Sequence, residues 1–255
     1  MLQLPSEALL HEETETVHAA AIHDARSFMR TALAGCLAEQ LQAIYQRYNV
    51  QQTYQQSIDQ IGGRSLKNAV LGYLMLVETG VELAWTQFTQ ADNMTDESAA
   101  LVALVNCPEA ADYAAQALAI FEEKYREEAL VMNLWLQIQA SNSQPGGLQR
   151  VLALMEHSAF SMTNPNKIRS LIGAFANANH VNFHNPDGSG YRFLTEQILA
   201  LNTVNPQIAA RLVTPLTRWK KFPEPNGQQM REALQNIANH ANLVKDLHEI
   251  VSKSL

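Results

Sequence analysis

The feature of this sequence that most constrains its fold is a succession of short amphipathic helical patterns. Apolar residues recur at helical spacing in segment after segment, and no segment shows the sustained apolar–polar alternation of a half-buried strand. Short polar, proline or glycine stretches close the patterns, as at residues 62–63 and 144–147. The sequence therefore predicts an all-α fold. We expect helices over residues 15–48 (broken near Gly35), 64–79, 81–91, 95–106, 109–127, 129–141, 147–157, 165–178, 189–203, 206–221, 227–240 and 243–253.

Helix-start signals support several of these boundaries. Asn164 precedes Pro165, and Asn205 precedes Pro206, which is the order expected of an N-cap followed by the first helical residue. Thr95 is expected to cap a third helix. These signals favour short helices that begin at defined residues.

Each helix has one apolar stripe and therefore needs neighbours on one side. Short helices joined by short loops can stack as antiparallel pairs into a solenoid or close into an irregular bundle. We favour an irregular α-solenoid, a HEAT-like superhelix of short antiparallel helix pairs without a strict sequence period. A single all-helical domain is expected over residues 1–255.

Composition narrows the classes of function. The chain has 255 residues, 47% of them hydrophobic, and a formal charge of −7 from 18 Lys and Arg against 25 Asp and Glu, which argues against a nucleic-acid binder. The longest apolar run, residues 69–77, is too short to cross a bilayer, and the N-terminal stretch is acidic where a signal peptide is basic. Cys36 and Cys107 suggest neither a disulfide framework nor a zinc site. The sequence predicts a soluble cytoplasmic protein without membrane partners.

Two histidine patterns are candidates for metal sites. The stretch HEETE begins like the zinc-protease signature at His11, but Glu15 stands where the second histidine is required. His180 and His184 have helical i, i+4 spacing, but they lie in a stretch rich in Asn, Pro, Asp and Gly that favours a loop. A loop or capping role is therefore expected for this pair, and no metal site is predicted in the chain.

Motifs of catalysis and of nucleotide binding are missing from the sequence. It has no nucleophile elbow, no phosphate-binding loop and no dinucleotide fingerprint, and neither cysteine has a recognisable base partner. The GSG stretch at 188–190 is interpreted as a turn with a capping serine before a helix. No catalytic residue is therefore assigned to this chain.

Two polar patterns beside apolar stripes are candidates for binding. Arg169 lies about 100° round the helix from Ile168, on the flank of a stripe formed by Ile168, Leu171, Ile172 and Phe175. A second polar stripe consists of Gln207, Arg211, Thr214 and Arg218. Such residues can be ordinary surface charges. If they lie on the concave side of a solenoid, they can instead bind a carboxylate or carbonyl group of a ligand.

Five sequence blocks carry a resemblance to a known family. They are DNMTD (92–96), ALVMNLWLQIQA (129–140), FSMTNPNKIRSLIGAFA (160–176), DGSGYRFL (187–194) and LNTVNPQIAARLVTPLTRWKKF (201–222). Together with LPSE near the start and EIVSKSL at the end, these blocks resemble the C-terminal domain of bacterial aminopeptidase N, over nearly the whole chain.

The resemblance implies a helical domain that caps the catalytic cleft of a zinc peptidase and encloses its peptide chamber. By motif match, Arg169, Arg211 and Gln207 would face that chamber and bind short peptides. The family's zinc ligands and catalytic residues belong to an upstream catalytic domain of the same polypeptide, and their motifs do not occur in this sequence. No cofactor is therefore expected in this chain. The alternative is a free-standing helical-repeat interaction module without peptidase activity.

Overall fold

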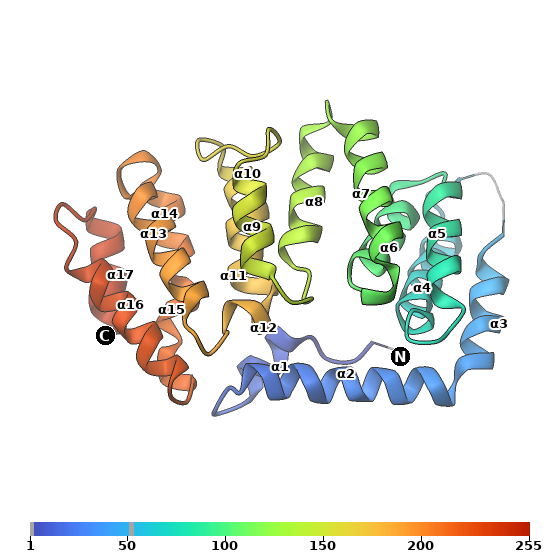
Figure 1. The fold of residues 1–255 in the computed structure, drawn as a ribbon, viewed down its shortest axis with the longest axis horizontal. Coiled ribbons are helices and arrows are strands. Elements are labelled where there is room, and N and C mark those ends of the chain that lie inside the picture. The colour runs from blue at the N-terminus through green and yellow to red at the C-terminus, as the bar shows by residue number, and fades with distance from the viewer. Residues whose placement is uncertain (1–2, 51–53) are drawn as a thin grey trace. The chain divides into compact units, whose positions relative to one another are not determined.

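The computed structural model describes residues 3–50 and 54–255, and all regular secondary structure in these ranges is helical (Figure 1). The all-α fold class is thereby confirmed. The elements are α1 Glu7–Glu13, α2 Ala19–Cys36, α3 Ala38–Tyr48, α4 Ile58–Leu74, α5 Gly80–Gln90, α6 Met94–Val105, η1 Pro108–Ala110, α7 Ala111–Tyr125, α8 Ala129–Ala140, α9 Gly147–Met155, α10 Pro165–Ile168, η2 Arg169–Gly173, α11 Ala174–Ala178, α12 His180–Phe183, α13 Ser189–Val204, α14 Pro206–Leu212, α15 Thr214–Thr217, η3 Trp219–Lys221, α16 Asn226–Ala238 and α17 Lys245–Ser254.

Contacts between residues divide the chain into two compact units. Unit 1 comprises the described residues of Met1–Pro5 and Asp24–Tyr125. Unit 2 comprises Ser6–His23 and Arg126–Leu255. No helix in the part of the chain that the structure describes is long and apolar enough to cross a bilayer.

In unit 1, helices that follow one another in the chain pack together. Helix α3 packs on α4, α5 on α6, and α6 on α7, while α4 also contacts α6. The apolar stripes predicted from the sequence form the interior of this unit, because each helix presents one apolar face to its neighbours. Its fully buried side chains include Val70, Leu71, Leu101, Leu104 and Phe121.

In unit 2, too, short helices pack against one another through their apolar faces. Helix α8 packs on α9 and on η2, α13 packs on α14 and α16, and α17 contacts α14 and α16. Its interior includes the fully buried Leu136, Leu194, Ile198, Leu216 and Leu234. In both units, short helices cover each other's apolar faces, which is the packing expected of a helical-repeat fold.

Several helix boundaries agree with the sequence-based expectation. Helices α5, α6, α8, α9, α13 and α16 begin within one residue of the expected positions, and the long N-terminal helix breaks at Leu37, close to Gly35. Asn164 caps α10 and Asn205 caps α14, each through its side-chain oxygen, as predicted. The prediction for the third cap was wrong, because Asn93 and not Thr95 accepts the hydrogen bond from the Asp96 N–H.

The glycines at 62–63 do not end a helix, contrary to expectation. Helix α4 runs through them from Ile58, and the Ser57 hydroxyl caps it by accepting from the Gln60 N–H. Glycine costs a helix about 1 kcal/mol per residue relative to alanine. The burial of Val70, Leu71 and Leu74 on the same helix outweighs that cost.

The expected helix over 206–221 is divided into α14, α15 and η3. Pro215 lies at the start of α15 and has no N–H to continue the hydrogen-bond ladder of α14. The polar stripe from Gln207 to Arg218 therefore does not follow one helix, and only Gln207 and Arg211 share the same element.

Three further local expectations in unit 2 were also wrong. Residues 180–183 form the short helix α12 rather than a loop, and Glu7–Glu13 forms a helix that the sequence pattern did not predict. Gly188, with a φ of 68°, precedes α13, so Ser189 is the first helical residue and not its cap. A left-handed φ favours glycine because it has no Cβ.

Candidate functional site

Residues 165–178 form one helical segment whose apolar face matches the prediction. Asn164 caps the segment by accepting from the N–H groups of Asn166 and Lys167. The four predicted stripe residues have no exposed surface: Ile168, Leu171, Ile172 and Phe175. Their burial fixes the rotation of the segment about its axis and leaves Arg169 on the exposed flank.

Arg169 begins a π-helical stretch, η2, inside this segment. Single π turns are rare and occur often at functional sites, because the wider turn changes the direction of the side chains that follow. The Arg169 side chain is exposed, and its Nη1 donates to Oδ1 of Asn166 at 3.1 Å. This bond steers the guanidinium without neutralising its charge.

The other two predicted binding residues, Gln207 and Arg211, lie on α14. Asn205 caps the helix, and Ile208, Ala209 and Leu212 anchor it in the interior. Gln207 and Arg211 are exposed and lie four residues apart, on one face of the helix. Neither side chain forms a hydrogen bond or an ion pair with any described residue, so both are available to a ligand.

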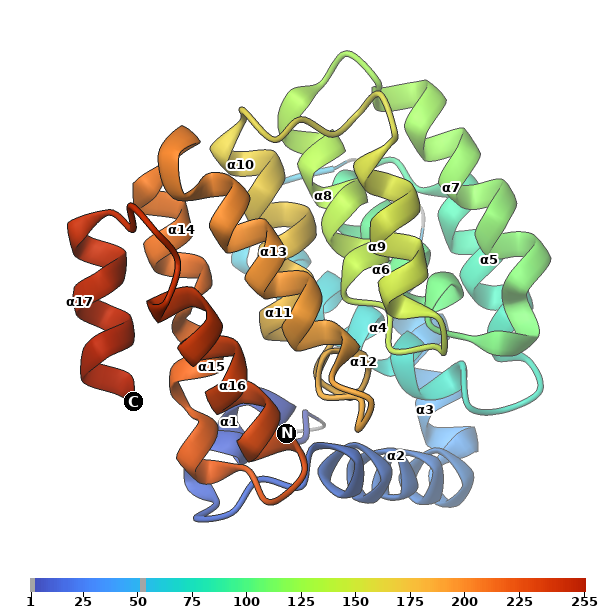
Figure 2. The ribbon, with the colours of Figure 1, turned by 60° about the vertical axis from the view of Figure 1, so that its left-hand side comes forward.

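The helical segment with Arg169 and helix α14 are neighbours (Figure 2). They meet at Gly173, where an added Cβ would lie 3.8 Å from the Arg169 Cβ and 3.9 Å from Cδ2 of Leu212. Arg169 and Arg211 therefore occupy adjacent elements of unit 2. No carboxylate pairs with either arginine within residues 3–50 and 54–255, so both retain the capacity to bind an anionic group.

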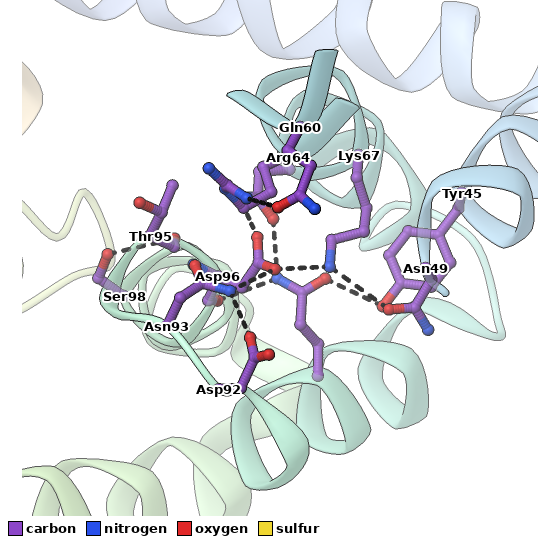
Figure 3. Close-up of polar contacts among 12 residues, drawn as sticks. Tyr45, Asn49, Gln60, Arg64, Lys67, Asp92, Asn93, Thr95, Asp96 and Ser98 are labelled. Carbon is purple, nitrogen blue, oxygen red and sulfur yellow. Dashed lines mark hydrogen bonds and ion pairs between the residues drawn. The ribbon is translucent and has the colours of Figure 1, made fainter. Parts of the chain in front are cut away.

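A second polar cluster lies in unit 1 around Lys67 and Asp96 (Figure 3). Lys67 is 5% exposed and Asp96 is 6% exposed, and their charged groups are 2.8 Å apart. Asn68 donates to the second carboxylate oxygen of Asp96 at 2.8 Å, and Gln87 donates to the Asp96 carbonyl at 3.0 Å. The pair joins α4 to α6, and every partner that it needs belongs to the protein.

Tyr45 completes this cluster from α3. Its hydroxyl donates to Oε1 of Gln87 at 3.0 Å. Burial, with a smaller contribution from the Asp96 charge, raises the pKa of Tyr45 to about 12. The hydroxyl therefore stays protonated at neutral pH, and the cluster acts as a structural cross-link rather than a binding site.

Cys107 does not have the surroundings of a nucleophile. Cys107 is buried, and its Sγ donates to Oε2 of Glu109 at 3.3 Å. Burial, together with this hydrogen bond, raises the pKa of the Cys107 thiol, which disfavours the reactive thiolate. Cys36 is exposed.

Sequence reasoning missed one assembly of side chains. His11, His180 and His184 lie together in unit 2, with one ring nitrogen of each within 4.8 Å of the other two. His11 is far from the other two in the sequence, and a loop over 180–184 would have given the spacing of His180 and His184 no geometric meaning. The only local signal was that i, i+4 spacing, which α12 makes meaningful.

The packing of short helices against one another in both units defines the class of this protein as a helical-repeat domain. The model of the family described as "Domain of unknown function (DUF3458_C) ARM repeats" matches residues 1–255. The chain belongs to this family, and the helical-repeat fold class is confirmed.

Sequence similarity to known proteins confirms the resemblance to the C-terminal domain of aminopeptidase N. The chain is 39% identical over 261 residues to aminopeptidase N of Escherichia coli, 37% over 259 residues to that of Haemophilus influenzae and 36% over 260 residues to that of Caulobacter vibrioides. All of this chain is covered in each case, but only 29%, 29% and 30% of the relative. The chain thus spans less than a third of the length of these relatives.

A solved structure shares the fold. The crystal structure of Legionella pneumophila aminopeptidase A in complex with aspartic acid matches 99% of this chain with a TM-score of 0.89 and 27% identity. The match covers 30% of that protein. Similar helical domains therefore occur as parts of larger aminopeptidases.

Proposed function

We propose that residues 1–255 form the single all-helical C-terminal domain of a cytoplasmic zinc aminopeptidase of the aminopeptidase N type. The observation that carries this proposal is that the whole chain aligns with under a third of each aminopeptidase N. In this proposal, an upstream catalytic domain of the same polypeptide holds the zinc and releases N-terminal residues from peptides. The domain described here has no hydrolytic activity of its own.

The proposed role of the domain is to cap the catalytic cleft, enclose the peptide chamber and hold short peptides there. Arg169, Arg211 and Gln207 would contact the backbone carbonyls or the C-terminal carboxylate of the peptide. Their exposure and the absence of a described carboxylate partner for either arginine support this role. Arginine suits such a contact because its planar fork of donors matches a carboxylate.

The test is made in the full-length polypeptide with Arg211→Ala and Arg169→Ala. Each substitution should raise KM for tri- and tetrapeptides by about tenfold, corresponding to about 1.4 kcal/mol of binding free energy, with a smaller change in kcat. The reason is that these residues would hold the peptide while other groups perform the chemistry. Steady-state kinetics on a peptide series provides the measurement.

Arg192→Ala is the matched control, because Arg192 is an exposed arginine of the same unit that donates to the Asp187 carbonyl. It should leave KM unchanged. Unaltered KM values in both test variants, toward dipeptides and longer peptides alike, would remove the proposed peptide contacts.

A further inference from the structure

Three histidine rings from separate parts of the sequence meet in unit 2. His11 comes from α1, His180 begins α12, and His184 directly follows α12. The ring centroids of His11 and His180 are 4.3 Å apart, and those of His180 and His184 are 6.1 Å apart with the rings nearly parallel. Helix α1 lies beside α12 in Figure 1.

Two ring nitrogens in this cluster have no hydrogen-bond partner although they are buried. They are Nε2 of His11 and Nδ1 of His180. His11 is 5% exposed and His184 is 9% exposed, and the Phe222 ring stacks on His184 at 4.4 Å. Buried polar atoms normally have a partner. Two buried nitrogens without a hydrogen bond, beside a third imidazole, therefore indicate that a bound ion is their partner.

The rings are in the form that binds metal ions. Burial is the main cause that lowers the pKa of all three histidines, for His11 to about 4, so they are neutral at pH 7. Glu7 acts in the opposite direction on His11 and His180, while Arg218 lowers the pKa of both and Lys221 that of His11. The Arg218 charge is partly balanced by Glu12, 3.4 Å away.

A second layer of hydrogen bonds orients His184. Its Nδ1 is 2.9 Å from the Tyr191 hydroxyl, and Asn226 Nδ2 donates both to that hydroxyl oxygen at 2.8 Å and to the His184 carbonyl at 2.9 Å. A metal ion bound at Nε2 of His184 requires the tautomer in which Nδ1 carries the proton and donates to the Tyr191 hydroxyl oxygen. Such support of a histidine through its other nitrogen is typical of metal sites.

We propose that His11, His180 and His184 bind a divalent transition-metal ion, with zinc as the ion of choice. Three neutral imidazoles without sulfur suit zinc, copper or nickel rather than magnesium or calcium. Tetrahedral ligands at about 2.1 Å from zinc are about 3.4 Å apart. The three nitrogens, now within 4.8 Å of one another, reach that geometry by shifts of roughly 1 Å.

A metal ion at this site fastens α1 to the body of unit 2. It joins position 11 to positions 180 and 184 in the folded chain, and because the unfolded chain does not hold the three imidazoles together, metal binding stabilises the folded state. Arg218 and Lys221 stand near His11, so their charges weaken binding. The inference does not depend on the proposed peptidase function, because it concerns the fastening of α1 and not the binding of peptide.

The experiment uses the untagged 255-residue chain, freed of metal by a chelator and dialysis. Zinc should bind at one equivalent with a Kd below about 100 µM. Saturation at about 100 times Kd should raise Tm by about 5–10 °C. Cobalt(II) should give the visible absorption of a four-coordinate site, and magnesium should have no effect.

His11→Gln and His180→Gln should each weaken zinc binding by more than about tenfold, and Tyr191→Phe by about tenfold. His240→Gln is the matched control, because His240 is exposed just after the end of α16, and it should leave zinc binding unchanged. If the cluster variants fail to fold, X-ray absorption of the zinc-loaded native chain decides the question by the number of imidazole ligands.

Three imidazoles at about 2.0 Å from zinc support the site. The proposal is overturned if the native chain does not bind zinc in this range, if zinc is bound by fewer than three imidazoles, or if the folded cluster variants bind zinc as well as the native chain does. If the KM experiment disproves the proposed peptide contacts, the zinc-binding result still stands. The two proposals can therefore fail independently.

Discussion

At the scale of single residues, the buried pair of Lys67 and Asp96 is a contact that fixes α4 against α6. Removing one partner of a buried pair leaves the other charge without compensation. Asp96→Asn should therefore lower the free energy of unfolding by about 3 kcal/mol, measured by urea denaturation followed by circular dichroism.

Two further variants make this prediction specific. The double variant Lys67→Met/Asp96→Leu should recover part of the loss, because apolar side chains of similar size need no partner. Glu249→Gln, which breaks the exposed pair of Glu249 with Lys253, should not change stability measurably. An Asp96→Asn variant as stable as the native chain would show that the buried pair is not a stabilising cross-link.

Residue-level sequence signals succeeded where the chemistry is local. Asn164 and Asn205 were identified as caps because a side-chain oxygen followed by proline has few other roles. The partners of Lys67 could not be identified in this way, because Asp96 lies 29 positions further along the chain and only packing brings the two together. The contacts of Arg169 and Arg211 with peptide stay a prediction.

At the scale of elements, glycine has opposite roles in two helices. Gly190 in α13 lies so close to α12 that an added Cβ would be 2.3 Å from the Phe183 carbonyl oxygen. Gly62 in α4 has no atom within 4 Å of that position. The first glycine is required by a close approach between helices, and the second is not.

Alanine substitutions at these two glycines should change the free energy of unfolding in opposite directions. Gly190→Ala should destabilise the chain by about 1–3 kcal/mol, because the backbone of α12 must shift. Gly62→Ala should stabilise it by about 0.5–1 kcal/mol, because alanine loses less conformational freedom in a helix. Thermal and urea unfolding measure both, and equal effects of the two substitutions would contradict the role of Gly190.

Element boundaries were hardest to predict where packing overrides local preference. The glycines at 62–63 lie inside α4, and Pro215 divides the expected helix over 206–221. Helix α1 was missed because its seven residues are short for an isolated helix, and contacts such as those of Lys221 with the carbonyls of His11 and Glu12 hold it in place.

At the scale of the whole molecule, the proposed function predicts that the 255-residue chain is inactive alone. It should not hydrolyse alanyl-p-nitroanilide above the uncatalysed rate, even with added zinc, because in the proposed function the zinc ligands and catalytic residues belong to the upstream catalytic domain. Release of p-nitroaniline measures this, and an enzyme-like turnover would contradict the proposal.

The coding sequence upstream of this chain separates the two hypotheses for the whole molecule. The aminopeptidase hypothesis requires a zinc-binding H-E-x-x-H domain in the same reading frame before Met1. A free-standing helical-repeat interaction module requires none. In unit 1, the large apolar side chains of Phe28 and Ile58 are exposed, and contact with another part of a longer polypeptide or with a partner protein would cover them under either hypothesis.

The sequence by itself determined the helical class, most helix positions, the buried stripe around Ile168 and the family resemblance, because periodicity, caps and motifs are local properties of the chain. Tertiary structure decided the pairing of Lys67 with Asp96, the adjacency of the helices that carry Arg169 and Arg211, and the meeting of His11 with His180 and His184. These contacts join residues far apart in the sequence, and their geometry depends on how the buried faces of several helices pack at once.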